Sequence, residues 1–215
     1  TSSLVNVRPL PPRPNLPGPV YIARDTLANR VLDSIGPNGA ILGDCESRVL
    51  ESALALCLMQ RLDVHPSARQ RATGYLRGQL LTGELDSFHQ ALSASVLGTE
   101  TRLGAAAAID AYLEGFEHFT SSRKRVFFTV VLASVSGELI ELELRPGDFD
   151  TGAEHQSWVV VMMAALKVLY FARRGQLDVI DQADIDKLLV TTASGGHGTW
   201  EQYLLAHLLA LLALD

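Results

Sequence analysis

The stretch Ile35–Gln60, IGPNGAILGDCESRVLESALALCLMQ, joins a glycine-rich turn to a helix that is apolar on nearly all sides. Gly36, Gly39 and Gly43 supply turn conformations that other residues adopt only at a cost. Asp44 stands at the expected helix start, where its carboxylate is suited to accept hydrogen bonds from the free N–H groups of the first turn, and the chain is expected to be helical from Ser47 onward. A helix that is apolar around its circumference is buried between other helices.

The same order of a polar glycine loop, a nearby acidic residue and an apolar helix recurs later in the chain. The loop Gly147–Gly152 precedes an expected helix over Ser157–Ala172, and the loop Ser194–Thr199 precedes another over Trp200–Leu214. Repeated units that cannot bury their own apolar surface are typical of helical repeat and toroid folds.

Strongly apolar helices alternate with amphipathic ones, and hydrophobic periodicity predicts about nine helices. The segment Asp181–Val190 is expected to be an outer helix with Asp184, Asp186 and Lys187 facing solvent. Val126–Val135 suits either a helix or a strand, and we assign it to a helix because the chain offers no clear partner strands. The alternation predicts an all-α fold, an α/α toroid in which inner helices contact neighbours all round and outer helices keep one solvated face.

The distribution of prolines predicts two regions. Six of the nine prolines fall in residues 1–20, which we expect to form an extended arm. This arm is either a strap or tail of the domain, or a ligand for a partner that recognises proline-rich segments. Residues 21–215 are expected to form a single helical domain.

The composition excludes several classes of protein. With a net charge of −6 and no concentrated basic face, the sequence argues against nucleic-acid binding. The apolar helices fall short of the roughly 20 residues that span a bilayer. Cys45 and Cys57 lie too far apart along one helix to pair. Because no charged segment followed by an apolar core opens the sequence, we expect a cytoplasmic protein with reduced thiols.

The glycine loops and apolar helices resemble the prenyltransferase/squalene-cyclase superfamily of α/α barrels. Asp44-Cys45 matches the first two positions of the Asp-Cys-Thr-Ala-Glu motif of oxidosqualene-type cyclases, and Glu46 departs from it. Asp148-Phe149-Asp150 matches the start of the Asp-x-Asp-Asp-Thr motif of bacterial class II cyclases, with Thr151 in place of the third acidic residue. The resemblance implies a class II terpene cyclase-like protein that begins cyclisation of an isoprenoid substrate by protonation.

This chemistry assigns roles to particular side chains. The middle aspartate, Asp150, is the first candidate for the acid and Asp44 is the second. Asp148 is placed to keep the proton on its neighbour, since like charges raise one member's pKa, and His155 is placed to orient the acid. Aromatic side chains near the loops would stabilise a cation and bind the substrate: Phe149, Trp158, Trp200 and Tyr203.

The sequence lacks close pairs of metal ligands and a D-D-x-x-D cluster, so we predict no metal and no cofactor. The chain is short for a complete barrel, which predicts a trimmed barrel or one completed by a second copy or another chain. The alternative function is a non-catalytic toroid that binds an apolar ligand or a partner chain.

Overall fold

The computed structural model describes residues 48–100, 103–114, 121–137, 143–151, 157–193 and 203–215. All of these residues belong to one compact unit, Ser47–Asp215. Among the described residues the regular structure is α-helix and short 3-10 helix without strands, so the predicted all-α class is confirmed. The elements are α2 (Val49–Arg61), α3 (Pro66–Thr82), α4 (Ser87–Leu97), α5 (Ala105–Leu113), α6 (Ser121–Ser136), η1 (Pro146–Phe149), α7 (Ser157–Arg173), η2 (Leu177–Val179), α8 (Gln182–Ala193) and α9 (Leu204–Leu214).

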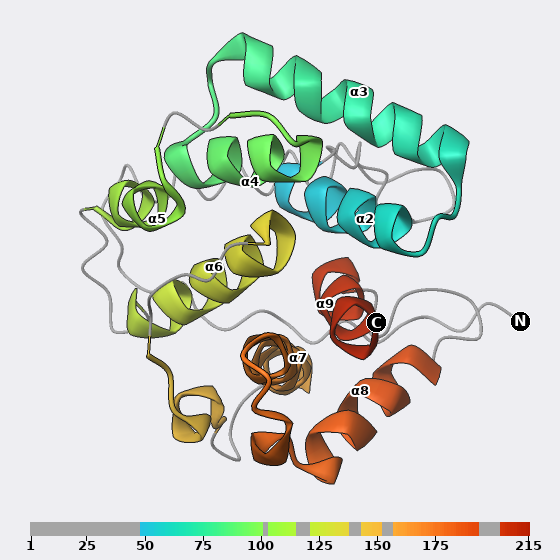
Figure 1. Cartoon of the computed structure of the whole chain (residues 1–215), viewed down its shortest axis with the longest axis vertical. Coiled ribbons are helices and arrows are strands. Elements are labelled where there is room, and N and C mark those ends of the chain that lie inside the picture. Colours follow the sequence, from blue (N-terminus) through green and yellow to red (C-terminus); the bar gives the residue numbers. More distant parts are fainter. Residues whose placement is uncertain (1–47, 101–102, 115–120, 138–142, 152–156, 194–202) are drawn as a thin grey trace, which may run out of the picture. The chain divides into compact units, whose positions relative to one another are not determined.

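The helices form an inner ring and an outer layer. The inner helices α2, α4, α6, α7 and α9 pack one against the next, and α9 packs back on α2 (Figure 1). Outside this ring, α3 lies on α2 and α4, α5 lies on α4 and α6, and α8 lies on α7 and α9. A closed ring with an outer layer is the packing that an α/α toroid requires, and the toroid remains our interpretation of the fold.

Burial follows the same division. The outer helix α3 has Leu76 as its one buried residue, whereas α7 is buried almost continuously from Val161 to Phe171. Each inner helix contributes large side chains that are almost fully buried, including Leu54, Phe88, Leu132, Leu166 and Leu209. The core therefore comprises the inner helices together with the outer-helix residues that pack on them, such as Leu76, Ile109 and Leu188.

Local chemistry sets the ends of the helices. Pro66 begins α3, and the region Val126–Val135 lies within α6, which confirms its assignment to a helix. The helix expected to begin at Ser47 begins at Val49, because Arg48 is extended with φ −93° and ψ 134°. The acidic residue in its first turn is consequently Glu51.

Other predictions fall partly or wholly outside the described residues. The described residues begin at Arg48. The proline-rich arm and its boundary therefore lie outside them, as do Asp44 and Cys45. Cys57 is a buried free thiol. No helix in the described part of the chain combines the length and the apolar character needed to cross a membrane.

Candidate functional site

The N-terminal parts of the five inner helices meet around a cavity of about 660 Å³. The lining includes the first turns of α2 and α7, His89 near the start of α4, and Tyr203 immediately before α9. The volume falls within the range of small-molecule sites, about 300–1,000 Å³. Because helix N-termini carry free N–H groups, this end of the ring favours negative charge in a ligand.

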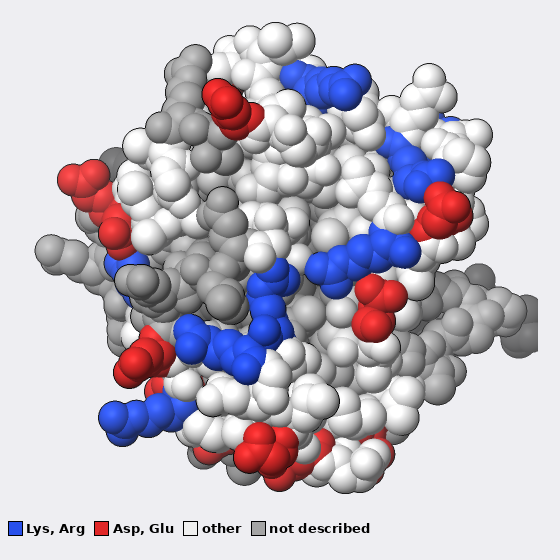
Figure 2. Space-filling model, viewed as in Figure 1, with Lys and Arg blue, Asp and Glu red and all other residues white. Residues whose placement is uncertain are grey.

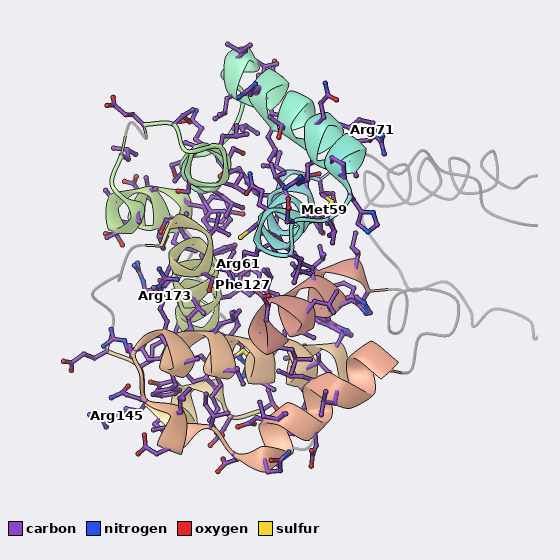
Figure 3. All side chains as sticks on the ribbon, turned by 45° about the vertical axis from the view of Figure 1, so that its right-hand side comes forward. Met59, Arg61, Arg71, Phe127, Arg145 and Arg173 are labelled. Carbon is purple, nitrogen blue, oxygen red and sulfur yellow. The ribbon has the colours of Figure 1, made fainter. Side chains whose placement is uncertain are left out.

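Aromatic rings form much of the cavity wall. The ring centroids of Trp158 and Tyr203 are 4.9 Å apart, and those of Tyr112 and Phe128 are also 4.9 Å apart at an interplanar angle of 83°. Phe127 of α6, which is labelled in Figure 3, also belongs to this lining. Aromatic faces attract cations with about 0.5–2 kcal/mol per contact, so this wall suits an apolar ligand or a developing carbocation.

Charged side chains stand among these rings. Arg48, Arg123 and Lys124 belong to the lining at the starts of α2 and α6. Glu51 is 8% exposed, and its Oε1 accepts a 2.8 Å hydrogen bond from Nη1 of Arg48. Among the described residues, Glu51 is the one carboxylate in this lining.

His89 is held at the cavity by the residue that caps its helix. Oδ1 of Asp86 accepts the backbone N–H of His89 at 3.0 Å, and Oδ2 lies 2.6 Å from the ring Nδ1. Burial alone would raise the pKa of Asp86, but the two hydrogen bonds from His89 outweigh it and lower the pKa. Burial, together with the charge of Asp86, raises the pKa of the Tyr112 hydroxyl.

A second cavity, of about 330 Å³, lies against another face of α7. Asp150 and Phe149 line it together with Lys167 and Asp184. Among the described residues, Met163 alone lines both cavities. The flexible thioether side chain of Met163 therefore stands between the two cavities.

The expectation that Asp184 faces solvent is wrong. Asp184 is 7% exposed, and its Oδ2 lies 2.7 Å from Nζ of Lys167, which is itself buried in α7. Asp181 holds the same ammonium group at 2.9 Å. The lysine on the facing helix draws Asp184 inward, because a buried charge is stable only when it is paired.

The structure separates the predicted site residues into two groups. Trp158 and Tyr203 come together in the wall of the larger cavity, whereas Asp150 and Phe149 line the smaller one. Phe149 packs there on Tyr170, with ring centroids 5.8 Å apart.

The remaining predicted residues do not join either group in the described structure. Asp148 is exposed, and its Oδ2 accepts the backbone N–H of Arg145 at 2.7 Å, which closes the turn of η1. Asp44, His155 and Trp200 lie outside the described residues.

Comparison with known proteins shows that the chain is similar to drimenyl diphosphate synthases. The chain is 40% identical over 205 residues to a drimenyl diphosphate synthase of Streptomyces showdoensis, covering 91% of this chain and 38% of that protein. It is 38% identical over 191 residues to a drimenyl diphosphate synthase of Streptantibioticus cattleyicolor, covering 89% of this chain and 35% of that protein. The chain thus spans less than two fifths of the length of these relatives. No family model matches it.

Among the polar residues of the two cavities that sequence reasoning missed are Glu51, Lys167 and His89. Glu51 and Lys167 each interrupt an apolar helix, a signal that marks a charge with a buried partner or a ligand. His89 follows Asp86 at the spacing of a helix cap, and this spacing predicts the backbone hydrogen bond. The sequence does not show that the ring faces the same cavity as Trp158, because the two residues meet only through the packing of the inner helices.

Proposed function

We propose that this chain forms part of a class II terpene cyclase, which protonates an isoprenoid diphosphate and closes it into rings. The relatives support this proposal, since they are named for synthesis of drimenyl diphosphate. A synthase whose product retains the diphosphate cannot start by expelling that group. Protonation of a carbon–carbon double bond is then the natural first step.

The observation that carries the proposal is the larger cavity with its aromatic wall. Its volume of about 660 Å³ and its apolar rings suit a folded hydrocarbon chain. A carbocation formed inside would lie beside the aromatic rings of Trp158, Tyr203 and Phe127.

The diphosphate is proposed to bind at the basic edge of the same cavity. Arg48, Arg123 and Lys124 supply positive charge beside the first turns of α2 and α6. Phosphate groups bind such positions well, because guanidinium and ammonium groups act together with the helix N–H groups. The apolar tail would then extend along the start of α7, past Trp158 toward Met163.

Asp150 is proposed as the acid, with Asp44 as the second candidate. Asp150 precedes α7 and lines the cavity that adjoins the larger one at Met163. Substrate that reaches both spaces has to displace the flexible Met163 side chain. In this proposal Asp148 and His155 help to hold and orient the proton, and Phe149 and Trp200 bind the hydrocarbon.

The test is the formation of cyclic products from farnesyl and geranylgeranyl diphosphate. We expect Asp150→Asn to reduce turnover by about 10²–10⁴-fold, the usual contribution of a general acid. Asp186→Asn is the matched control, because Asp186 is an exposed aspartate of α8 that lies in neither lining. If Asp150→Asn and Asp44→Asn both keep full turnover, the assignment of the acid fails.

One observation favours a second candidate function. The proposed acid lines the smaller cavity rather than the larger apolar one, which suits a protein that binds an apolar ligand or a partner chain without reaction. Saturable binding of farnesyl diphosphate without any cyclic product would support this alternative.

A further inference from the structure

The carboxylate of Asp86 fixes both the position and the proton of His89. One oxygen accepts the backbone N–H at 3.0 Å, and the other lies 2.6 Å from Nδ1 of the ring. A ring nitrogen that contacts a carboxylate at this distance carries a hydrogen, so the lone pair of the neutral imidazole lies on Nε2. The side chain of His89 is 24% exposed, so solvent retains access to it.

The surroundings of the ring direct it to the larger cavity. Its ring packs edge to face against Phe88 at 5.3 Å and Tyr112 at 6.0 Å between centroids. These two neighbours fix the plane of the imidazole within an apolar wall. His89 and Tyr112 both line the cavity in which the hydrocarbon is proposed to fold.

We infer that His89 is the base that ends the reaction by removing a proton from the cyclised carbocation. This inference rests on the proposed function. Nε2 takes a proton from a carbon next to the cationic carbon, and the electrons of that C–H bond become the new double bond. The acid adds one proton and His89 removes one, so the product is an isomer of the substrate.

The resulting imidazolium is stabilised by the carboxylate of Asp86 and loses its proton to solvent. Asp86 acts here as a positioning residue, since it reaches the substrate only through His89. Its lowered pKa keeps it ionised throughout the neutral range, which the stabilisation of a cation requires.

Five other polar groups of the described lining are less suited to this step. Arg48, Arg123 and Lys124 are proton donors without a lone pair at neutral pH. The raised pKa of Tyr112 keeps its hydroxyl protonated. Glu51 already accepts a hydrogen bond from the guanidinium of Arg48 at 2.8 Å. The variant Glu51→Gln therefore serves as the comparison for His89→Gln.

The experiment compares His89→Gln and Glu51→Gln with the unchanged protein, using farnesyl diphosphate and analysing all products after removal of the diphosphate. We expect His89→Gln to reduce the normal alkene product by about 10²-fold or more. Cations that have lost their base should leave as hydroxylated products or as alkenes with the double bond elsewhere. His65→Gln is the control, because His65 is exposed at the start of α3 and lies outside the cavity lining.

Two further variants separate catalysis from a structural role. We expect added imidazole to restore the normal product in His89→Ala, which a merely misfolded site would not allow. Asp86→Asn keeps a residue that caps α4 well, so we expect its unfolding midpoint to change little while turnover falls. If the unfolding midpoint of Asp86→Asn falls so far that unfolding alone explains the lost turnover, the role of Asp86 in positioning His89 is contradicted.

The outcomes distinguish this inference from the proposed function. Cyclic product that is unchanged in amount and structure in His89→Gln overturns the base assignment and leaves the cyclase proposal standing. The same holds if Glu51→Gln, and not His89→Gln, changes the products. If the unchanged protein yields no cyclic product, the proposed function fails and takes the base assignment with it.

Discussion

Lys167 is a charged residue in the middle of the apolar helix α7, and its ammonium group joins α7 to the start of α8. Nζ lies 2.7 Å from Asp184 and 2.9 Å from Asp181. Burial alone would lower the pKa of Lys167, but the hydrogen bonds to Asp184 and Asp181 outweigh it and raise the pKa. The lysine therefore stays charged at neutral pH and holds α8 against the inner ring.

Replacing Lys167 by methionine should destabilise the fold strongly. The change keeps an unbranched side chain but leaves the carboxylate of Asp184 buried without its main partner, at a cost of about 3 kcal/mol. We expect Lys187→Met to cost less than about 1 kcal/mol, because Lys187 is 46% exposed and lies 3.6 Å from the same carboxylate. Urea unfolding measures both. Equal losses of unfolding free energy in the two variants would show that burial of Lys167 does not increase its contribution to stability.

Individual residues were predicted with uneven success, and burial explains why. The periodicity of α8 placed Asp184 on a polar face, but a periodic pattern does not record the charge on the facing helix. Lys167 on α7 supplies that charge, 17 residues earlier in the sequence. Trp158 and Tyr203 were expected beside glycine loops, and the structure adds that their rings contact each other, with centroids 4.9 Å apart.

At the level of whole elements, one glycine inside α3 and one at the end of α4 differ in backbone conformation. Gly78 lies in the interior of α3 with open space where a Cβ would stand, whereas Gly98 ends α4 with φ +65°. A helical φ suits alanine, but a positive φ strains it. The same substitution should therefore have opposite effects at the two positions.

We expect Gly78→Ala to stabilise the protein by about 0.5–1 kcal/mol. We expect Gly98→Ala to destabilise it by about 1–2 kcal/mol, since the left-handed conformation brings Cβ against the backbone. Chemical denaturation of the two variants provides the measurement. A change of the same sign in both would contradict the assignment of these two backbone conformations.

Helices were the most predictable part of the chain. Their positions follow from apolar periodicity and from start and stop residues such as Pro66 and Gly98. The assignment of Val126–Val135 to a helix was confirmed, because α6 packs between other helices and needs no strand partner. The start of α2 was placed two residues early, since the extended conformation of Arg48 has no signal in the apolar pattern.

Across the whole ring, the two ends of the inner helices carry different chemistry. Their N-terminal ends line the larger cavity, and Arg61 joins the C-terminal ends of three of them, α2, α6 and α9. Nη2 of Arg61, from α2, donates to the carbonyl of Ser134 in α6 at 2.6 Å, and its Nη1 lies 3.7 Å from Asp215, which follows α9. Figure 2 shows several Lys and Arg side chains near the middle of one face, with most Asp and Glu side chains toward its edge.

Arg61→Met should weaken the ring as a whole. The change removes a charged hydrogen bond to Ser134, and such bonds contribute about 1.5–3 kcal/mol. Arg71→Met is the matched control, because Arg71 is exposed on the outer helix α3, as Figure 3 shows, and should change stability by less than about 0.5 kcal/mol. Thermal unfolding compares the two. No difference between them would contradict the role of Arg61 in joining three helices.

The candidate site was predictable only in part, for a reason that belongs to the whole molecule. The sequence indicated which segments carry acids and aromatic rings, because these lie beside the glycine loops. The assembly of His89, Tyr112 and Trp158 around one cavity depends on α4, α5 and α7 meeting in space, which local patterns do not encode.

The most direct measurement is the reaction of the protein with farnesyl diphosphate in D₂O, followed by mass spectrometry of the intact product. Acid-initiated cyclisation transfers a solvent-derived proton to carbon and leaves the diphosphate in place. We therefore predict a cyclic diphosphate that carries one deuterium bound to carbon. A cyclic product without deuterium, accompanied by released inorganic diphosphate, would contradict this mechanism.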